Sequence, residues 1–96
     1  MIVSFNDAAT EQFFLHGKLP AKGCGWASVS KVAARKLDML DAATELLDLR
    51  SPPGNRLETL RGNLDGFYSV RINDQWRIVF RWTDEGAADV FITDYH

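Results

Sequence analysis

Cysteine and histidine are scarce in this 96-residue chain. The single cysteine, Cys24, excludes a disulfide within the chain. It stands between Gly23 and Gly25 in a loop sequence, with no histidine or acid nearby in sequence, so we assign it no chemical role. The two histidines, His16 and His96, are far apart in sequence, and no Cys/His cluster has metal-ligand spacing. We therefore expect neither a metal nor a cofactor.

Other absences narrow the class of protein. The longest apolar stretch falls short of the roughly 18 residues that a membrane-spanning helix needs. Residues 1–7 lack a basic region followed by an apolar run, so we expect no signal peptide and a cytoplasmic location. Motifs of serine hydrolases, phosphate loops and dinucleotide-binding folds are missing. With only three prolines and 46% hydrophobic residues, residues 1–96 are expected to form one folded domain.

The formal net charge of −2 counts against a nucleic-acid partner, but the charges are unevenly distributed. No acidic residue lies between Gln12 and Leu37, and every basic residue from Arg50 to Arg81 is an arginine. Arginine suits bidentate binding of phosphate, although a solvated surface explains most such positions equally well. The basic residues are Lys18, Lys22, Lys31, Arg35 and Lys36 in the first group, and Arg50, Arg56, Arg61, Arg71, Arg77 and Arg81 in the second.

The first half of the sequence predicts one short strand followed by helices. Asn6 or Asp7 can cap the first helix, and Ser28 or Ser30 can cap the second. The run 51–54, which contains two prolines and a glycine, ends the helical part. The expected elements are a strand at 1–5, a helix at 7–16, a loop at 17–27, a helix from about 30 to 40 and a short helix at 44–49.

After Gly54 the hydrophobic period changes from helical to alternating. Alternation at 68–72, 76–82 and 89–92 predicts an antiparallel sheet with one face in the core. Because helices come first and strands last, we expect an α+β fold with the helices on one face of the sheet.

The register of the first hairpin can be derived from its apolar pattern. A three-residue loop at 73–75 places Val70 opposite Ile78, whereas a two-residue turn would place it opposite a charge. The three-residue loop also places Arg71 directly opposite Arg77 on the other face. Like charges in that position are unfavourable, which an anion between them would explain. The alternative is that both arginines point into water or pair with nearby aspartates, Asp74 or Asp89.

The chain ends on three groups that can transfer protons: Asp94, Tyr95 and His96. The last strand should lie beside the hairpin and bring these groups to the face that carries Arg77. RNA can be cut without a metal when a base activates the 2′-hydroxyl, an acid protonates the 5′-oxygen and a cation stabilises the phosphate charge. Each residue alone has a more ordinary explanation, namely solvation for His96, packing for Tyr95 and a salt bridge for Arg77.

Several segments of the sequence resemble HigB, a toxin family of type II toxin–antitoxin systems within the RelE superfamily. The resemblance covers residues 37–96 closely, and residues 1–5 fit the first strand. It is carried by the runs Pro-Pro-Gly-Asn-Arg-Leu-Glu at 52–58, Leu-Arg-Gly at 60–62, Gly-Phe-Tyr-Ser-Val-Arg-Ile-Asn-Asp-Gln-Trp-Arg-Ile at 66–78 and Asp-Tyr-His at 94–96.

The resemblance implies a RelE-like fold and a ribosome-dependent endonuclease that cuts mRNA in the 30S A site. Arg77 matches the family's essential arginine. Asp94 and His96 match its acid–base residues, and Tyr95 matches the tyrosine that orients the target nucleotide. Arg61 stands where relatives often carry lysine. It is expected to contact phosphate, as is Arg71, and Lys31 and Arg35 are expected to contribute a basic RNA-binding face.

The resemblance also implies partners. These are a HigA-like helix-turn-helix antitoxin, the ribosome with its mRNA, and operator DNA only through the antitoxin. Trp26 and Trp82 are candidates for the antitoxin contact, with core packing as the alternative. Two other hypotheses stay open. One is a ParE-like toxin that binds DNA gyrase without cutting RNA, and the other is a degenerate toxin that survives as a folded partner or corepressor of a neighbouring antitoxin. The terminal run 94–96 argues against the first and, together with Arg77, against the second.

Overall fold

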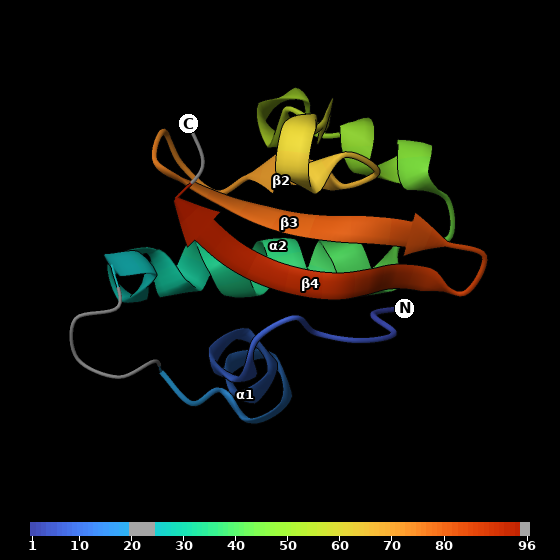
Figure 1. Cartoon of the computed structure of the whole chain (residues 1–96). Coiled ribbons are helices and arrows are strands. Elements are labelled where there is room, and N and C mark those ends of the chain that lie inside the picture. Colours follow the sequence, from blue (N-terminus) through green and yellow to red (C-terminus); the bar gives the residue numbers. More distant parts are fainter. Residues whose placement is uncertain (20–24, 95–96) are drawn as a thin grey trace.

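The computed structural model describes residues 1–19 and 25–94, and it is built from two α-helices and a four-stranded sheet (Figure 1). The strands follow the order β1-β2-β3-β4, and each pairs antiparallel with its neighbour. The predicted α+β class is thus confirmed. The bounds are α1 Ala8–His16, α2 Ser30–Ala42, β1 Glu58–Thr59, β2 Tyr68–Arg71, β3 Trp76–Thr83 and β4 Gly86–Asp94, with 3₁₀ turns η1 Gly25–Val29, η2 Leu46–Arg50, η3 Pro53–Asn55 and η4 Gly62–Leu64.

The N-terminal segment runs along the outer edge of β4. It makes two isolated parallel bridges, Ile2 with Ala87 and Phe5 with Val90, and forms no continuous strand. The strand predicted at 1–5 is therefore wrong as an element but right as an extended, sheet-associated segment. Four backbone hydrogen bonds of 2.7–3.1 Å join the two segments. They satisfy edge groups of β4 that would otherwise be open to pairing with another chain.

The two helices begin differently. Asp7 caps α1, because its side chain accepts a hydrogen bond of 2.8 Å from the amide of Thr10. The serine caps predicted for the second helix are wrong: α2 follows the 3₁₀ turn η1, and its N-cap is Val29, without a side-chain cap. Ser28 instead donates to the carbonyl of Gly25 within that turn. The short helix predicted at 44–49 is the 3₁₀ turn η2, which has a capping box.

The main core lies between the sheet and the helices, and Figure 1 shows α2 running along one face of β3 and β4. Leu37 and Leu40 of α2 are fully buried against the inward side chains of the strands. Phe13 of α1 packs edge-on against Trp26, with ring centroids 5.0 Å apart. Trp26 is thus a core residue, and Trp82 packs partly buried against the same core. Both helices cover the same face, as predicted.

The β2–β3 hairpin has the register that the apolar pattern predicted. Val70 pairs with Ile78 and Arg71 with Arg77. The Oδ1 atom of Asn73 accepts from the amides of the last loop residue and of the first residue of β3, at 2.9 and 2.7 Å. This local hydrogen bonding closes the three-residue loop. The sequence pattern missed β1, which is too short to show alternation.

A bulge interrupts the pairing of β3 with β4 between Val79 and Arg81. Asp89 sits in the bulge with a φ of 52°. Its carboxylate accepts from the Nε of Arg81 at 2.7 Å, and its amide donates to the Oγ of Ser4 at 2.9 Å. The bulge therefore ties the β3–β4 hairpin to the N-terminal segment.

Candidate active site

Arg77 lies on the sheet face opposite α2 and is mostly buried, with 12% of its side chain exposed. Its Nε donates to the Oγ of Ser69 at 2.7 Å, and its Nη2 donates to the carbonyl of Arg56 at 2.7 Å. The carboxylate of Glu58 is 3.8 Å from Nη2. The guanidinium is thus oriented by two neutral acceptors, with one acid at the outer limit of an ion pair.

Local sequence explains why these acceptors meet Arg77. The hairpin register pairs Ser69 with Val79, two residues along β3 from Arg77, so the serine is its diagonal neighbour on the same face. Arg56 follows the turn η3 in a left-handed conformation with a φ of 45°, which is costly for a residue other than glycine. In this conformation, its carbonyl accepts the hydrogen bond from Arg77.

Arg71 is directly opposite Arg77 but has a different charge partner. Its Nη2 forms an ion pair with Asp74, the exposed middle residue of the hairpin loop. The hydrogen bond and positive charge of Arg71 lower the pKa of the Asp74 carboxyl. Arg81 likewise pairs with Asp89 at 2.6 Å. The expected like-charge juxtaposition is therefore real, and pairing with aspartates explains Arg71 and Arg81.

Asp94 ends β4 and pairs in register with Trp76, one residue before Arg77 on β3. Because successive side chains of a strand alternate between faces, its Cβ lies on the face opposite that of Arg77. Its Oδ2 accepts from the Nε2 of Gln75 at 3.0 Å. The last strand does bring Asp94 beside the hairpin, as predicted. However, its Cβ does not lie on the face that carries Arg77. Tyr95 and His96 lie outside the described residues.

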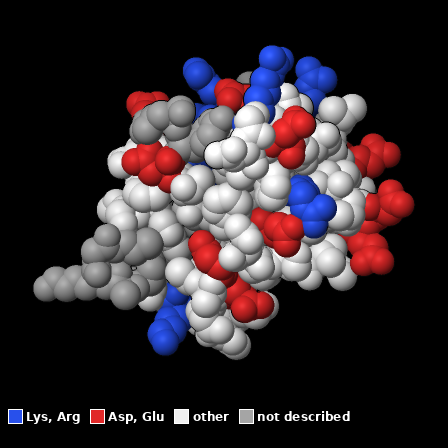
Figure 2. Space-filling view, viewed as in Figure 1, with Lys and Arg blue, Asp and Glu red and all other residues white. Residues whose placement is uncertain are grey.

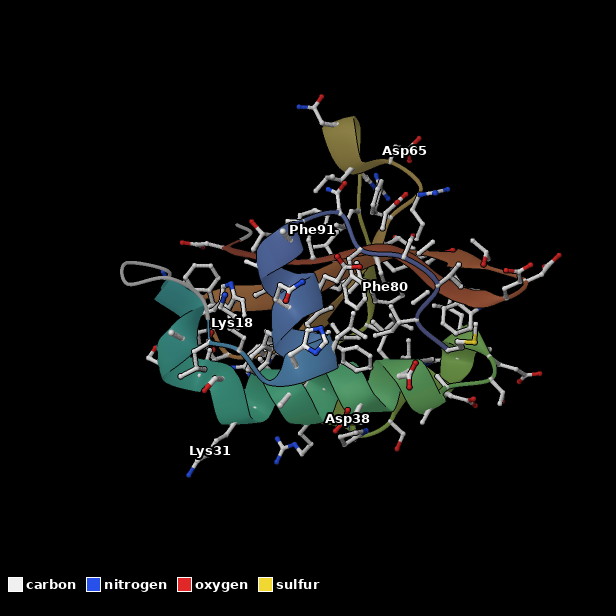
Figure 3. The ribbon with its side chains drawn as sticks, turned by 90° about the horizontal axis from the view of Figure 1, so that it is seen from below. Lys18, Lys31, Asp38, Asp65, Phe80 and Phe91 are labelled. Carbon is white, nitrogen blue, oxygen red and sulfur yellow. The ribbon has the colours of Figure 1, made fainter. Side chains whose placement is uncertain are left out.

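Arg61 is exposed beside the turn η4, on the side of the sheet away from α2. Figure 3 shows Asp65, which follows η4, and Asp38, on α2, on opposite sides of the sheet. Arg61 and Asp65 line an open hollow of about 270 Å³ together with the aromatic ring of Phe67. Phe67 packs edge-on against Phe91 of β4, with centroids 6.3 Å apart. The hollow therefore has a cation, an acid and an aromatic wall.

The three basic residues of α2 point in two different directions. Lys31 and Arg35 are exposed, and Figure 3 shows Lys31 pointing away from the sheet. Lys36 points inward and is 7% exposed. Lys31 and Arg35 are four positions apart and lie on the same side of α2, whereas Lys36 faces the core, so only the first two can contribute to an exposed basic face. Lys22 and Cys24 lie outside the described residues.

The surface charge differs between regions. Figure 2 shows Lys and Arg side chains along the upper rim, above the part that carries η3 and β2 in Figure 1, and acidic side chains along the right-hand side. The β3–β4 turn there carries the exposed Asp84 and Glu85. The negative net charge is thus compatible with a basic region near β2.

Sequence reasoning missed the residues that hold Arg77, namely Ser69, Glu58 and the carbonyl of Arg56. Ser69 could have been found, since the correct hairpin register makes it a diagonal neighbour of Arg77. The Arg56 carbonyl carried no sequence signal, because its direction depends on a left-handed backbone. Within residues 1–19 and 25–94, no three His, Cys, Asp or Glu side chains gather as a metal site. No helix there is long and apolar enough to span a membrane.

The architecture, two α-helices packed on a four-stranded antiparallel sheet, is that of RelE-like toxins. The sequence-family model of the RelE-like toxin HigB of type II toxin–antitoxin systems matches residues 3–96, and the chain belongs to this family. It is similar to toxin HigB-1 of Vibrio cholerae, with 41% identity over 96% of this chain and 95% of that one. It is also 29% identical to the endoribonuclease HigB of Proteus vulgaris over the full length of both.

Solved structures show the same fold. A YoeB–YefM complex from Staphylococcus aureus matches with a TM-score of 0.60 and 23% identity, covering 100% of this chain and 95% of that one. A YoeB dimer from the same organism matches with a TM-score of 0.59 and 22% identity, over 99% and 94% of the two chains. Since a type II toxin is defined by its antitoxin, family membership supports an antitoxin as the partner of this chain.

Proposed function

We propose that this chain is a ribosome-dependent endoribonuclease that cuts mRNA by attack of the RNA's own 2′-hydroxyl. The endoribonuclease HigB of Proteus vulgaris, which aligns over the whole chain, supports the activity. The family supports the role of a toxin. The 30S A site as the place of cleavage rests on the resemblance in residues 52–78 and 94–96.

The proposal depends above all on the hydrogen bonds that orient the guanidinium of Arg77. The Oγ of Ser69 and the carbonyl of Arg56 each accept a hydrogen bond from the guanidinium, and the carboxylate of Glu58 is 3.8 Å from Nη2. Such a pre-oriented cation can stabilise the negative charge that develops on a phosphate without reorganising during the reaction. Arg81, whose side chain is 47% exposed and pairs with Asp89, is less firmly placed on the sheet.

In the proposed reaction, a base removes the proton of the 2′-hydroxyl, and O2′ forms a bond to the adjacent phosphorus. The P–O5′ bond breaks, and an acid protonates the leaving O5′. The products are a 2′,3′-cyclic phosphate and a 5′-hydroxyl. Asp94 and His96 are proposed as the acid–base residues, Tyr95 as the residue that orients the nucleotide, and Arg61 and Arg71 as phosphate contacts. This chemistry requires no metal.

The proposed partner is a HigA-like helix-turn-helix antitoxin, through which alone the toxin would reach operator DNA. The relationship to type II systems supports an antitoxin in general. The proposed site of action, the ribosome, places the chain in the cytoplasm.

The test is cleavage of mRNA by the purified chain with and without a programmed ribosome. We expect cleavage only on the ribosome, with 5′-hydroxyl ends. Arg77→Ala should lower the cleavage rate by about 10²-fold or more, the usual effect of removing one transition-state donor. Arg81→Ala is the matched control, since Arg81 lies on the same strand and pairs with Asp89. Growth arrest without cleavage would refute the proposal and make DNA gyrase the next target to test.

A further inference from the structure

Lys36 is a buried cation without a carboxylate partner among the described residues. It is 7% exposed and takes part in none of the ion pairs found there. Burial, followed by the charges of Arg35 and Arg71, lowers the pKa of its ammonium group. An apolar residue would fill the same space without this cost. Its polar contact is a short hydrogen bond from Nζ to the Oδ1 of Asn55.

Asn55 is the last residue of the turn η3, and it is 1% exposed. Its Nδ2 donates to the carbonyls of Leu49 and Ser51, at 3.1 and 3.3 Å, and its backbone amide donates to the carbonyl of Pro52 at 2.9 Å. With Oδ1 bonded to Lys36, the side chain joins α2 to the carbonyls of Leu49 and Ser51, which precede η3. This bonding leaves Asn55 little freedom to move.

The next residue, Arg56, connects this turn to the candidate site. Its φ of 45° is a conformation that persists only where the surroundings fix it. Its amide donates to the carbonyl of Pro53 at 3.2 Å, and its own carbonyl accepts from the Nη2 of Arg77 at 2.7 Å. A continuous path of contacts therefore runs from Lys36 through Asn55 and Arg56 to the Arg77 guanidinium.

We propose that Lys36 and Asn55 are positioning residues that hold the Arg56 carbonyl in place and thereby orient Arg77. The inference adds residues to the machinery of the proposed ribonuclease and rests on that function for its catalytic consequence. Neither side chain contacts the RNA in this proposal. Their effect on cleavage is transmitted by one backbone carbonyl.

The orientation of Arg77 can be measured without any activity. In nitrogen-labelled protein, a guanidinium whose Nη2 is hydrogen-bonded gives separate Nη signals, because rotation is slow. Arg77→Lys identifies these signals by their loss. We expect them to merge in Asn55→Ala and to broaden in Lys36→Met, while Lys36→Arg, which keeps a donor, restores the separation. Lys31→Met, an exposed position of the same helix, is the matched control for these spectra and should leave the Arg77 signals as in the wild type.

Cleavage on the ribosome supplies the second measurement. Asn55→Ala and Lys36→Met should lower the single-turnover cleavage rate by about tenfold, the scale of one hydrogen bond to a charged group, with unchanged affinity for the ribosome. If Asn55→Ala does not fold, Lys36→Met carries the test.

The outcomes are distinguishable. Unchanged Arg77 signals in folded variants overturn the proposal, even if cleavage falls, since the effect then bypasses Arg77. Merged signals with unchanged cleavage overturn the catalytic part. A wild-type chain that cuts no mRNA refutes the proposed function, while the spectra still decide whether Lys36 and Asn55 orient Arg77.

Discussion

Ser69 and Arg77 lie diagonally across β2 and β3, and the serine hydroxyl accepts the Nε–H of the arginine at 2.7 Å. Ser69 itself is completely buried. A small hydroxyl therefore fixes one end of the guanidinium, and the carbonyl of Arg56 fixes the other. Both acceptors are neutral, and the carboxylate of Glu58 lies 3.8 Å from Nη2.

Ser69→Ala should lower the rate of RNA cleavage more than it lowers stability. The loss of a hydrogen bond to a charged group costs roughly 1.5–3 kcal/mol, which corresponds to about a tenfold to 150-fold lower rate if the bond matters in the transition state. Single-turnover cleavage and thermal unfolding measure the two effects. Ser28→Ala, at an exposed turn position, serves as the control. A rate equal to that of the wild type would show that the hydroxyl does not orient Arg77 for the reaction.

Removal of residues 94–96 should abolish growth arrest and leave the protein folded. The hydrogen bond of Asp94 to Gln75 is exposed, whereas the pairing of β4 with β3 extends over most of both strands. Circular dichroism melting of the truncated chain, beside growth assays at matched expression, separates loss of activity from unfolding. Asp94→Asn tests the carboxylate alone. Toxicity that persists in the truncated chain would remove all three terminal residues from the proposed mechanism.

The stability of the wild type relative to Lys36→Met should rise with pH in the alkaline range. The pKa of Lys36 is lowered in the folded protein, while the unfolded chain keeps the usual value near 10.5. Between these two values the unfolded state binds more protons, so raising the pH favours the folded state. Urea unfolding of both proteins at several pH values up to 10.5 gives the difference, in which the other titrating groups cancel. A difference independent of pH would contradict the lowered pKa.

Gly86→Ala should destabilise the protein far more than Gly62→Ala. Gly86 has a φ of 130°, and an added Cβ would lie 2.0 Å from the carbonyl oxygen of Met1. Gly62 also has a positive φ, of 69°, but its Cβ would meet nothing within 4 Å. We expect a loss of about 1 kcal/mol for Gly62→Ala, from backbone strain alone, and about 3 kcal/mol or more for Gly86→Ala. Denaturant unfolding of both variants measures the difference, and equal losses would argue against the close approach of Met1.

The β2–β3 hairpin shows what local sequence patterns can predict. Alternating side chains and a short polar loop were enough to predict that Arg71 faces Arg77, because a slip of one residue would have exposed the apolar face. The partners of these arginines were not predictable to the same degree. Asp74 is near Arg71 in sequence and was a candidate, whereas Arg56 is 21 residues from Arg77 and contributes a backbone atom.

Lys36 is a second residue whose partner could not be predicted from local sequence. In the sequence it belongs to a basic segment together with Lys31 and Arg35, and nothing local distinguishes it from them. The helix turns Lys36 toward the core, where Asn55 accepts its hydrogen bond. Helical spacing gave the direction of the apolar residues, but the partner of a buried amine depends on a turn that arrives from elsewhere in the chain.

Periodicity and turn residues were sufficient for the α+β class and the register of the β2–β3 hairpin, since these depend on neighbours close in sequence. Tertiary structure alone decided which groups orient Arg77, that Asp94 lies on the opposite face of the sheet and that Lys36 is buried. The physical reason is that hydrogen bonds between distant segments require a particular packing of the turn 51–56 against α2 and β2. Such packing results from the whole chain folding together, and local propensity does not encode it.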